Sequence, residues 1–253
     1  MKPRVRQHAF TLIELLVVIG IIGFLLFLAM PIYNGPKNKA TMVVCMSHLK
    51  QIDVGIQMYL EDQLNKSPGN TNAARSPFLS WTDYRGLIGD YVGVKHAPSA
   101  QDKVFACPAD IFYYAMSSKD RPVTEQPLHE QSNYVFTSYA YNAGMVTTRP
   151  TTNSVGTITP GTTNYYGIAG MRMESIVHPA KTVLIAEMPA YAPYSWHAPK
   201  KPLSQKNSKF NDSKNVLAFV DGHAQYTRMF YDGKTVAWST NPPAPYAYQW
   251  GGD

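Results

Sequence analysis

An almost uninterrupted apolar segment near the N-terminus limits what this chain can fold into more than any other feature. It runs from Leu12 to Ile32 and reads LIELLVVIGIIGFLLFLAMPI. An α-helix rises ~1.5 Å per residue, so about 20 apolar residues are enough to cross the hydrocarbon core of a bilayer. The segment therefore predicts a transmembrane helix over about residues 11–32 instead of a helix in a soluble core.

Basic residues on its N-terminal side orient this helix. Lys2, Arg4 and Arg6 precede the apolar run, and positive flanking residues favour the cytoplasmic side. Residues after about 33 are then expected outside. A secretory signal peptide has a shorter apolar stretch followed by a small residue at its cleavage site, whereas the small residue Ala9 comes first here. An uncleaved signal anchor is the more serious alternative.

A single carboxylate interrupts the apolar run close to its start. Glu14 is that residue, and a charged group inside hydrocarbon costs a few kcal/mol unless it has a partner. Cleavage between Ala9 and Phe10 would create such a partner, a cationic α-amino group four residues upstream. This arrangement favours a helix that does more than anchor the chain.

The segment QHAFTLIELLVVIGIIGFL resembles the cleavage and methylation signature of type IV prepilins and type II secretion pseudopilins. The resemblance implies that residues 1–9 are a cytoplasmic leader, and that a membrane aspartyl peptidase cuts before Phe10 and N-methylates it. It also implies that Glu14 meets the N-terminus of a neighbouring subunit during assembly. Pro31 is similar in position to a proline that many pilins carry in this helix. Such a proline loosens the helix, because it removes a backbone hydrogen bond. The family usually has Gly before the cut, so Ala9 is expected to lower the efficiency of cleavage.

Beyond the first segment the apolar pattern becomes periodic. Between residues 40 and 64, apolar residues recur mostly at three- and four-residue steps, which is typical of a helix with one buried face. These residues are Val44, Leu49, Ile52, Ile56, Tyr59, Leu60 and Leu64. Turn-forming residues from Asn65 to Gly69 then end the helix. The pattern predicts a spine helix over 10–64, whose outer half packs against a globular domain over 66–253.

The composition of that domain favours loops and β-structure. The chain has 17 Tyr and 19 Pro among 253 residues, a balance that suits a loop-rich β-containing domain. A short helix is expected near 82–92. The polar stretch from Thr147 to Thr163 reads as a surface loop. The Pro-rich, aromatic C-terminal segment is expected to lie on its own domain or on a neighbour.

The C-terminal third gives clearer strand signals. Thr182 to Glu187 reads as a buried strand, and Asp221-Gly222 between NVLAFV and HAQYTR predicts a hairpin, since Asp-Gly supplies the positive φ angles of a tight turn. Asp232-Gly233 extends this to an antiparallel meander over about 215–239. The predicted fold class is α+β: a long N-terminal helix, half transmembrane and half amphipathic, packed on an antiparallel sheet in a pilin-like arrangement.

Later segments resemble the large pilin-like proteins that carry a C-terminal His-x9-Asp-Gly motif. The similar segments are CMSHLKQIDVGIQMY, VFACPAD, SYAYN, HPAKTVLIAE and NVLAFVDGHA. The first His of that motif falls on Asn211 in this chain. The structural role of the hairpin carries over, but a role that needs the imidazole does not.

The chain has only two cysteines, Cys45 and Cys107. In an oxidising compartment they can form one disulfide, which would contribute roughly 4 kcal/mol because it closes a long loop. Two buried free thiols are the alternative. Cys45 and His48 share a helix face and could join Cys107 as metal ligands, but the pattern offers no fourth ligand. No metal or cofactor is therefore assigned.

Charge and motifs point neither to nucleic-acid binding nor to catalysis. The net charge of +6 includes three basic residues of the leader, and the others are scattered, so no nucleic-acid partner is expected. The sequence has no phosphate-binding loop, zinc-protease helix or nucleophile elbow. Asp221 and His223 could pair as acid and imidazole, but turns favour Asp for backbone reasons alone. The chain is expected not to be an enzyme.

The sequence favours a structural subunit of an extracellular type IV pilus-like filament or of a secretion pseudopilus. Its expected partners are other copies of the chain in a helical homo-oligomer, the prepilin peptidase, the inner-membrane assembly machinery and, before assembly, the membrane. The prepilin is expected in the inner membrane and the mature chain in an extracellular filament or periplasmic pseudopilus. The alternative is a minor or tip pilin that acts as a binding module, an adhesin for glycan or surface ligands.

Overall fold

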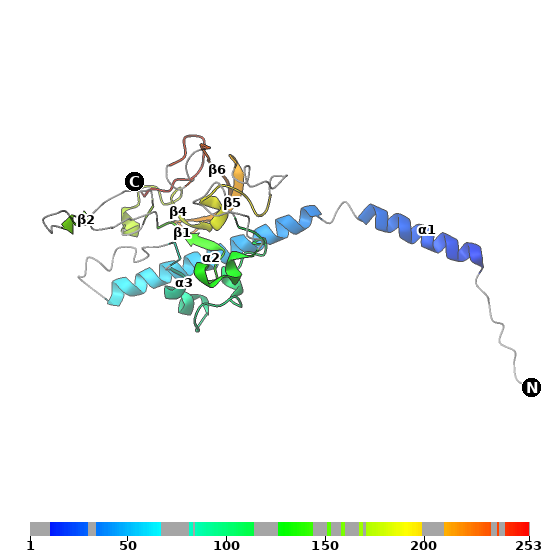
Figure 1. Ribbon diagram of the computed structural model, residues 1–253, viewed down its shortest axis with the longest axis horizontal. Helices are drawn as coiled ribbons and strands as arrows, with labels where there is room; N and C mark the ends of the chain where they lie inside the picture. Colours follow the sequence, from blue (N-terminus) through cyan, green and yellow to red (C-terminus); the bar gives the residue numbers. More distant parts are fainter. Residues whose placement is uncertain are drawn as a thin grey trace, which may run out of the picture. The chain divides into compact units, whose positions relative to one another are not determined.

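A computed structural model shows two N-terminal helices and a mixed α+β unit (Figure 1). It describes residues 11–29, 34–66, 81–82, 84–113, 126–143, 151–152, 158–159, 167–168, 171–198, 210–233, 237 and 241–252. Ala9, Phe10 and Pro31 lie outside these ranges, so the proposals of processing and of a helix-loosening proline stay predictions. The chain divides into two compact units, Met1–Ala40 and Thr41–Asp253.

The described residues from Leu12 to Lys66 are all helical. Helix α1 spans Leu12–Ala29 and helix α2 spans Asn34–Lys66, while residues 30–33 lie outside the described ranges. Among the described residues, no helix has both the length and the hydropathy needed to cross a bilayer. The transmembrane span expected at about 11–32 stays a prediction.

Buried side chains form a stripe along α2. The stripe consists of Cys45, Leu49, Ile52, Ile56 and Leu60. Their steps of four and three residues keep them on one helix face, as the sequence predicted. One member was assigned wrongly: Val44 is 40% exposed, because a residue next to Cys45 is turned by about 100° around a helix of 3.6 residues per turn. Tyr59 is only partly buried.

The central sheet of the second unit has four antiparallel strands in the order β1-β4-β5-β6. The strands are β1 Tyr139–Tyr141, β4 Val183–Glu187, β5 Ser213–Phe219 and β6 Ala224–Met229. All residues of β1 and β4 are buried, which confirms the buried strand predicted at 182–187. Apolar residues of the α2 stripe and of these strands form one hydrophobic cluster, so α2 packs on the sheet. This α+β arrangement confirms the predicted fold class.

The predicted hairpin at Asp221-Gly222 joins β5 to β6. The Gly222 N–H donates to the carbonyl oxygen of Phe219, and the Phe219 N–H donates to that of His223, both at 2.9 Å. Gly222 has φ 91°, in the left-handed region that glycine adopts without steric cost. Of the two turn residues, only Gly222 has a positive φ. The sequence suggested a positive φ at Asp221 as well, and that part of the prediction is wrong. The strand expected after Gly233 falls mostly outside the described ranges.

Short elements make up much of the remaining described chain. The short helices are α3 Tyr84–Leu87, η2 Gly89–Val92, η3 Lys103–Phe105, η4 Leu128–Glu130, η5 Ser132–Tyr134, η6 Met173–Ser175 and η7 Met188–Ala190. The first two confirm the short helix expected near 82–92. Strands β2 Thr151–Thr152 and β3 Ile158–Thr159 form a separate antiparallel pair. The stretch predicted as a loop thus contains two short strands, whose residues are all β-branched and favour extended backbone.

The C-terminal segment lies on its own domain, one of the two placements predicted for it. Gln249 forms a parallel bridge with Thr182, and the Val183 N–H donates to the Gln249 carbonyl oxygen at 3.0 Å. Trp250 is fully buried. The Asn142 side-chain amide donates to the carbonyl oxygens of Val183 and Trp250, each at 2.8 Å, and so ties this segment to the edge of the sheet.

The α2 stripe gives a matched pair of stability predictions. Ile52 is fully buried, whereas Val54 on the same helix is 56% exposed. We expect Ile52→Ala to lower the free energy of unfolding by about 2–5 kcal/mol, because it leaves a cavity. Val54→Ala should change it by less than about 0.5 kcal/mol. Denaturant unfolding of the full chain in detergent, followed by tryptophan fluorescence, measures both, and equal losses would contradict the assigned face.

Candidate functional site

Thr11 and Glu14 form reciprocal hydrogen bonds at the start of α1. Glu14 Oε2 accepts from the Thr11 backbone N–H at 2.8 Å and from the Thr11 hydroxyl at 2.7 Å. The Glu14 N–H lies 3.4 Å from Thr11 Oγ1. This is a capping box, which satisfies backbone N–H groups that have no partner within the helix. In the single chain, the acid singled out in the sequence stabilises the beginning of its own helix.

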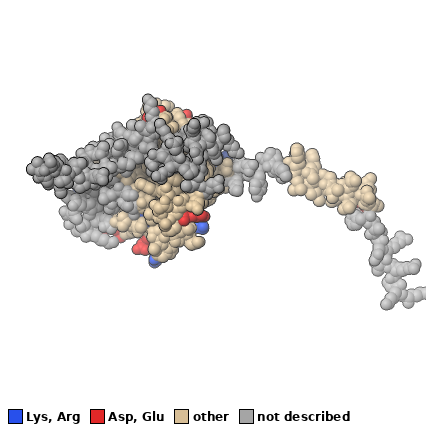
Figure 2. Space-filling view, in the orientation of Figure 1, with Lys and Arg blue, Asp and Glu red and all other residues tan. Residues whose placement is uncertain are grey.

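The remainder of α1 exposes apolar side chains on every side. Their exposed fractions range from 49% for Val18 to 80% for Leu12. Figure 2 shows this helix as a surface without charged residues in that view. Large continuous apolar surfaces mark places where a protein contacts other proteins or lipid. The exposed apolar side chains of α1 therefore form a surface of the kind that contacts other proteins or lipid.

A disulfide bond joins Cys45 and Cys107 in the second unit. Cys45 belongs to the α2 stripe, Cys107 follows η3, and both are fully buried. Because the bond closes a loop of more than 60 residues, loop-closure entropy predicts a stabilisation on the order of 4 kcal/mol. His48, considered above as a companion ligand, bonds elsewhere: its Nδ1 lies 3.1 Å from the carbonyl oxygen of Ala106.

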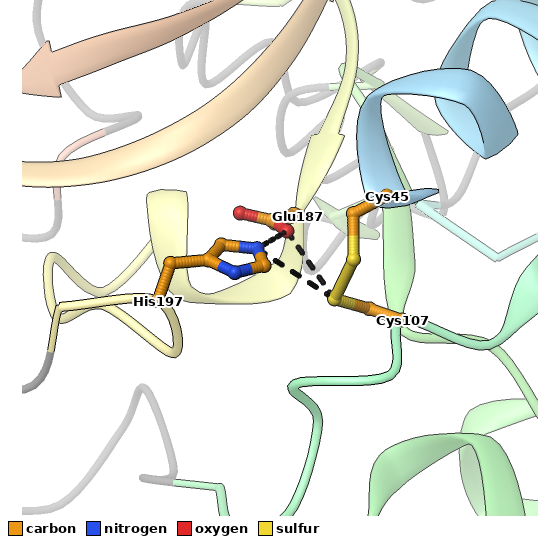
Figure 3. Close-up of side chains that lie close together, drawn as sticks. All are labelled: Cys45, Cys107, Glu187 and His197. Atoms are coloured by element: carbon orange, nitrogen blue, oxygen red, sulfur yellow. Dashed lines mark hydrogen bonds and ion pairs between the residues drawn. A yellow bond between two sulfur atoms is a disulfide. The ribbon is translucent and has the colours of Figure 1, made fainter. Parts of the chain in front are cut away.

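A glutamate and a histidine lie against this disulfide (Figure 3). Glu187 ends β4 and His197 follows η7, and both are buried. His197 Nε2 lies 2.7 Å from Glu187 Oε1 and 3.8 Å from Cys107 Sγ, and Glu187 Oε1 lies 3.4 Å from that sulfur. One candidate ligand atom from each of Cys45, Cys107, Glu187 and His197 lies within 4.8 Å of the others. We call these four residues the Cys-Glu-His cluster; they are the described residues best suited to hold a metal ion.

Neighbouring groups hold the two polar members of this cluster in place. The backbone N–H of Val216, in β5, donates to Glu187 Oε2 at 2.8 Å. His197 Nδ1 lies 3.5 Å from the hydroxyl oxygen of Thr41 in α2. The contact to Val216 leaves Glu187 Oε1 facing His197 and the sulfur, and the contact to Thr41 leaves His197 Nε2 facing the same point.

Sequence reasoning identified the cysteines of this cluster but missed Glu187 and His197. One signal was present: Glu187 ends a run that reads as a buried strand, and a buried charge requires a partner. His197 stands in an irregular segment between η7 and β5, where no periodicity indicates which way a side chain faces. The pairing is therefore visible only in three dimensions.

Titratable groups also gather at the turn between β5 and β6. Asp53 of α2 is 2% exposed, and its Oδ1 lies 3.5 Å from the Gln57 amide nitrogen, which also donates to the Val220 carbonyl oxygen. Burial raises the pKa of Asp53 to about 6, and the charge of Asp221 acts in the same direction. Asp221 Oδ1 lies 2.5 Å from His223 Nδ1 and accepts from the His223 backbone N–H at 3.2 Å. These contacts support the turn role of Asp221.

Asn211, which the sequence resemblance aligns with the first His of the C-terminal motif, is held by two hydrogen bonds. Its Oδ1 accepts from the Tyr231 backbone N–H at 2.9 Å and from the Tyr246 hydroxyl at 3.0 Å. Asn211 immediately precedes the β5 hairpin in the chain and bonds two segments that follow that hairpin. Its side chain thus connects parts of the backbone through an amide oxygen.

Comparison with known families identifies the N-terminal segment. Residues 4–30 match the prokaryotic N-terminal methylation motif. The chain therefore carries the N-terminal signature of a type IV pilin-type or pseudopilin-type precursor, and the matched range includes Phe10, Glu14 and all of α1. No curated protein and no solved structure matches the chain.

The raised pKa of Asp53 predicts how stability depends on pH. A folded-state pKa of about 6, above the ordinary 3.8, means that folding favours the protonated carboxyl. This contribution is fully present below about pH 4 and is lost as the pH rises through about 6, at a cost of about 1–3 kcal/mol. Asp53→Asn should remove that loss, whereas Asp90→Asn, at an exposed carboxylate, should retain it. Denaturant unfolding between pH 4 and 8 tests this; parallel curves for wild type and Asp53→Asn would contradict it.

Proposed function

We propose that this chain is a structural subunit of a type IV pilus-like filament or secretion pseudopilus, assembled through α1 after prepilin processing. The observation that carries the proposal is an exposed helix that is apolar except for one carboxylate in its first turn, inside a match to the methylation motif. An anchor needs the apolar surface but not the acid. A filament core uses both.

Processing supplies the charge that the acid requires. Cleavage between Ala9 and Phe10 would release the leader and leave an α-amino group, which N-methylation keeps cationic. In the free chain Glu14 is bonded to Thr11 of its own helix. In the packed core of a filament, where water is absent, a carboxylate is stabilised by a cation, and the amino group of a neighbouring Phe10 is the proposed partner.

The proposed route begins in the inner membrane. The prepilin peptidase and the inner-membrane assembly machinery act on the chain there, and the apolar α1 leaves lipid for the core of a homo-oligomeric helical filament. The mature product is then an extracellular filament or a periplasmic pseudopilus. Transfer between two apolar surroundings retains the burial of α1, so the electrostatic contact of Glu14 selects the packed state.

A groove favours the second candidate function, a minor or tip pilin that binds a ligand. The groove has a volume of about 250 Å³ and is lined by β5, β6 and the C-terminal segment. Lys214 lies over the ring of Tyr226 at 5.9 Å and Arg228 over that of Tyr246 at 6.0 Å. Aromatic rings next to cations suit an anionic glycan. Subunit stoichiometry separates the two roles, because a tip subunit is rare in filaments and a major pilin dominates them.

Glu14 gives the sharpest test of the assembly role. We expect Glu14→Gln to lower the yield of filaments at least about tenfold, since losing even about 1.4 kcal/mol of contact energy lowers an association constant tenfold. Membrane insertion should be unchanged, because the amide retains the length and apolar character of the helix. Glu174→Gln, at an exposed acid of the second unit, serves as the control. Electron microscopy and quantitation of sheared filaments and membrane fractions provide the readout; a normal filament yield would overturn the role of Glu14.

Processing is tested separately by mass spectrometry of the mature N-terminus. We expect a chain that begins with N-methylated Phe10. Because the small residue before the cut enters the peptidase site, Ala9→Gly should increase the fraction of processed chain in cells sampled during expression. An N-terminus at Met1 in purified filaments would contradict the proposed maturation.

A further inference from the structure

We propose that, once its disulfide is reduced, this chain binds one zinc ion through the Cys-Glu-His cluster. The ligands are the thiolates of Cys45 and Cys107, a carboxylate oxygen of Glu187 and Nε2 of His197. Metal coordination and the disulfide are then alternative ways of joining α2 to the segment after η3. The proposal concerns the second unit alone and does not depend on filament assembly.

The ligand types and their spacing suit zinc. Structural zinc sites are tetrahedral, with cysteine sulfur, histidine nitrogen or carboxylate oxygen at about 2.0–2.3 Å, so neighbouring ligand atoms lie about 3.3–3.8 Å apart. The three distances among Glu187 Oε1, His197 Nε2 and Cys107 Sγ are 2.7, 3.4 and 3.8 Å. Small side-chain adjustments therefore reach the tetrahedral spacing once the sulfur–sulfur bond is open. Sulfur ligands also disfavour magnesium and calcium, which prefer oxygen.

The surrounding contacts are those that orient metal ligands. A metal-bound histidine usually donates its other ring N–H to a neighbour, and a bound carboxylate is itself hydrogen-bonded. Thr41 is placed to accept from His197 Nδ1, which directs the Nε2 lone pair to the cluster. The Val216 N–H already occupies the second oxygen of Glu187. Both positions are held before any ion arrives.

Burial explains why an ion would stabilise the reduced cluster. The His197 and Glu187 side chains are 2% and 0% exposed, and both cysteines are fully buried. Two thiolates and one carboxylate carry three negative charges, which a buried site does not tolerate without cations. A divalent ion offsets two of those charges and fills the coordination of all four groups, so that the site needs no water ligand.

The redox step requires a dithiol reductant. The disulfide accepts two electrons and two protons and becomes two thiols, while the two thiols of the reductant become its disulfide. Zinc binding then displaces both thiol protons into solvent. Thiols persist in reducing surroundings and disulfides in oxidising compartments, so the zinc form is expected where the folded chain meets a reductant and the disulfide form elsewhere.

Cobalt(II) is the probe, because it takes zinc sites and its absorption bands report tetrahedral geometry and sulfur coordination. The full chain in detergent is reduced with dithiothreitol, desalted without oxygen and titrated with cobalt. We expect one cobalt per reduced chain, with the thiolate charge-transfer band of a tetrahedral site, and displacement of cobalt by zinc. The oxidised chain should show none of these bands.

Substitutions identify the ligands beyond the cysteines. His197→Gln and Glu187→Gln should each lower the cobalt affinity of the reduced chain at least about tenfold. His48→Gln is the matched control, because His48 lies one turn from Cys45 on α2 and bonds to the Ala106 carbonyl instead. Its affinity should equal that of wild type. Circular dichroism of the oxidised variants checks that each one folds.

A reduced wild-type chain without the tetrahedral thiolate bands would overturn the proposal, as would unchanged affinity in both His197→Gln and Glu187→Gln. Should these variants unfold on reduction, X-ray absorption of the zinc-loaded reduced wild type decides instead. Two sulfur and two nitrogen or oxygen ligands support the site, and any other set overturns it. These measurements use purified chain, so their failure is distinct from a failure of filament assembly.

Discussion

The packing of one face of α2 against the antiparallel sheet organises the whole second unit. The stripe from Cys45 to Leu60 supplies the layer that covers the sheet. The same helix also contributes Cys45 to the disulfide and Gln57 to the contact with the β5–β6 turn. The opposite side of α2 retains exposed apolar residues, among them Val43 and Met58, which in the proposed filament would meet neighbouring subunits. In the proposed filament, one helix would thus serve a domain core and an interface at once.

Helix α1 differs from α2, since its described side chains have large exposed apolar surfaces. Two interactions compete for the Glu14 carboxylate. In the single chain, this carboxylate accepts hydrogen bonds from Thr11. Assembly as proposed exchanges that local contact for an ionic one with another subunit. The helix is stable in either situation because the capping bonds and the ionic contact address the same group. Such an exchange would let a hydrophobic segment be both inserted into a membrane and extracted from it.

The sequence predicted the elements better than it predicted their contacts. Strand β4, the β5–β6 hairpin and the α2 face follow from local periodicity and turn chemistry, which need only neighbouring residues. The stripe begins at Cys45 instead of Val44, since cysteine is among the most buried residue types and Val44 lies about 100° away around the helix. The contact of Glu187 with His197 and the burial of Asp53 depend on segments far apart in the chain. No spacing rule reaches across such separations.

Trp250 belongs to the hydrophobic core although it stands far along the chain from most of the other core residues. Its indole is fully buried, and its carbonyl oxygen accepts from Asn142 next to β4, so the core is incomplete until residues near 250 have been synthesised. A chain emerging N-terminus first would present α2 and the first strands long before this segment arrives. The described core is therefore completed only when the segment around Trp250 joins it.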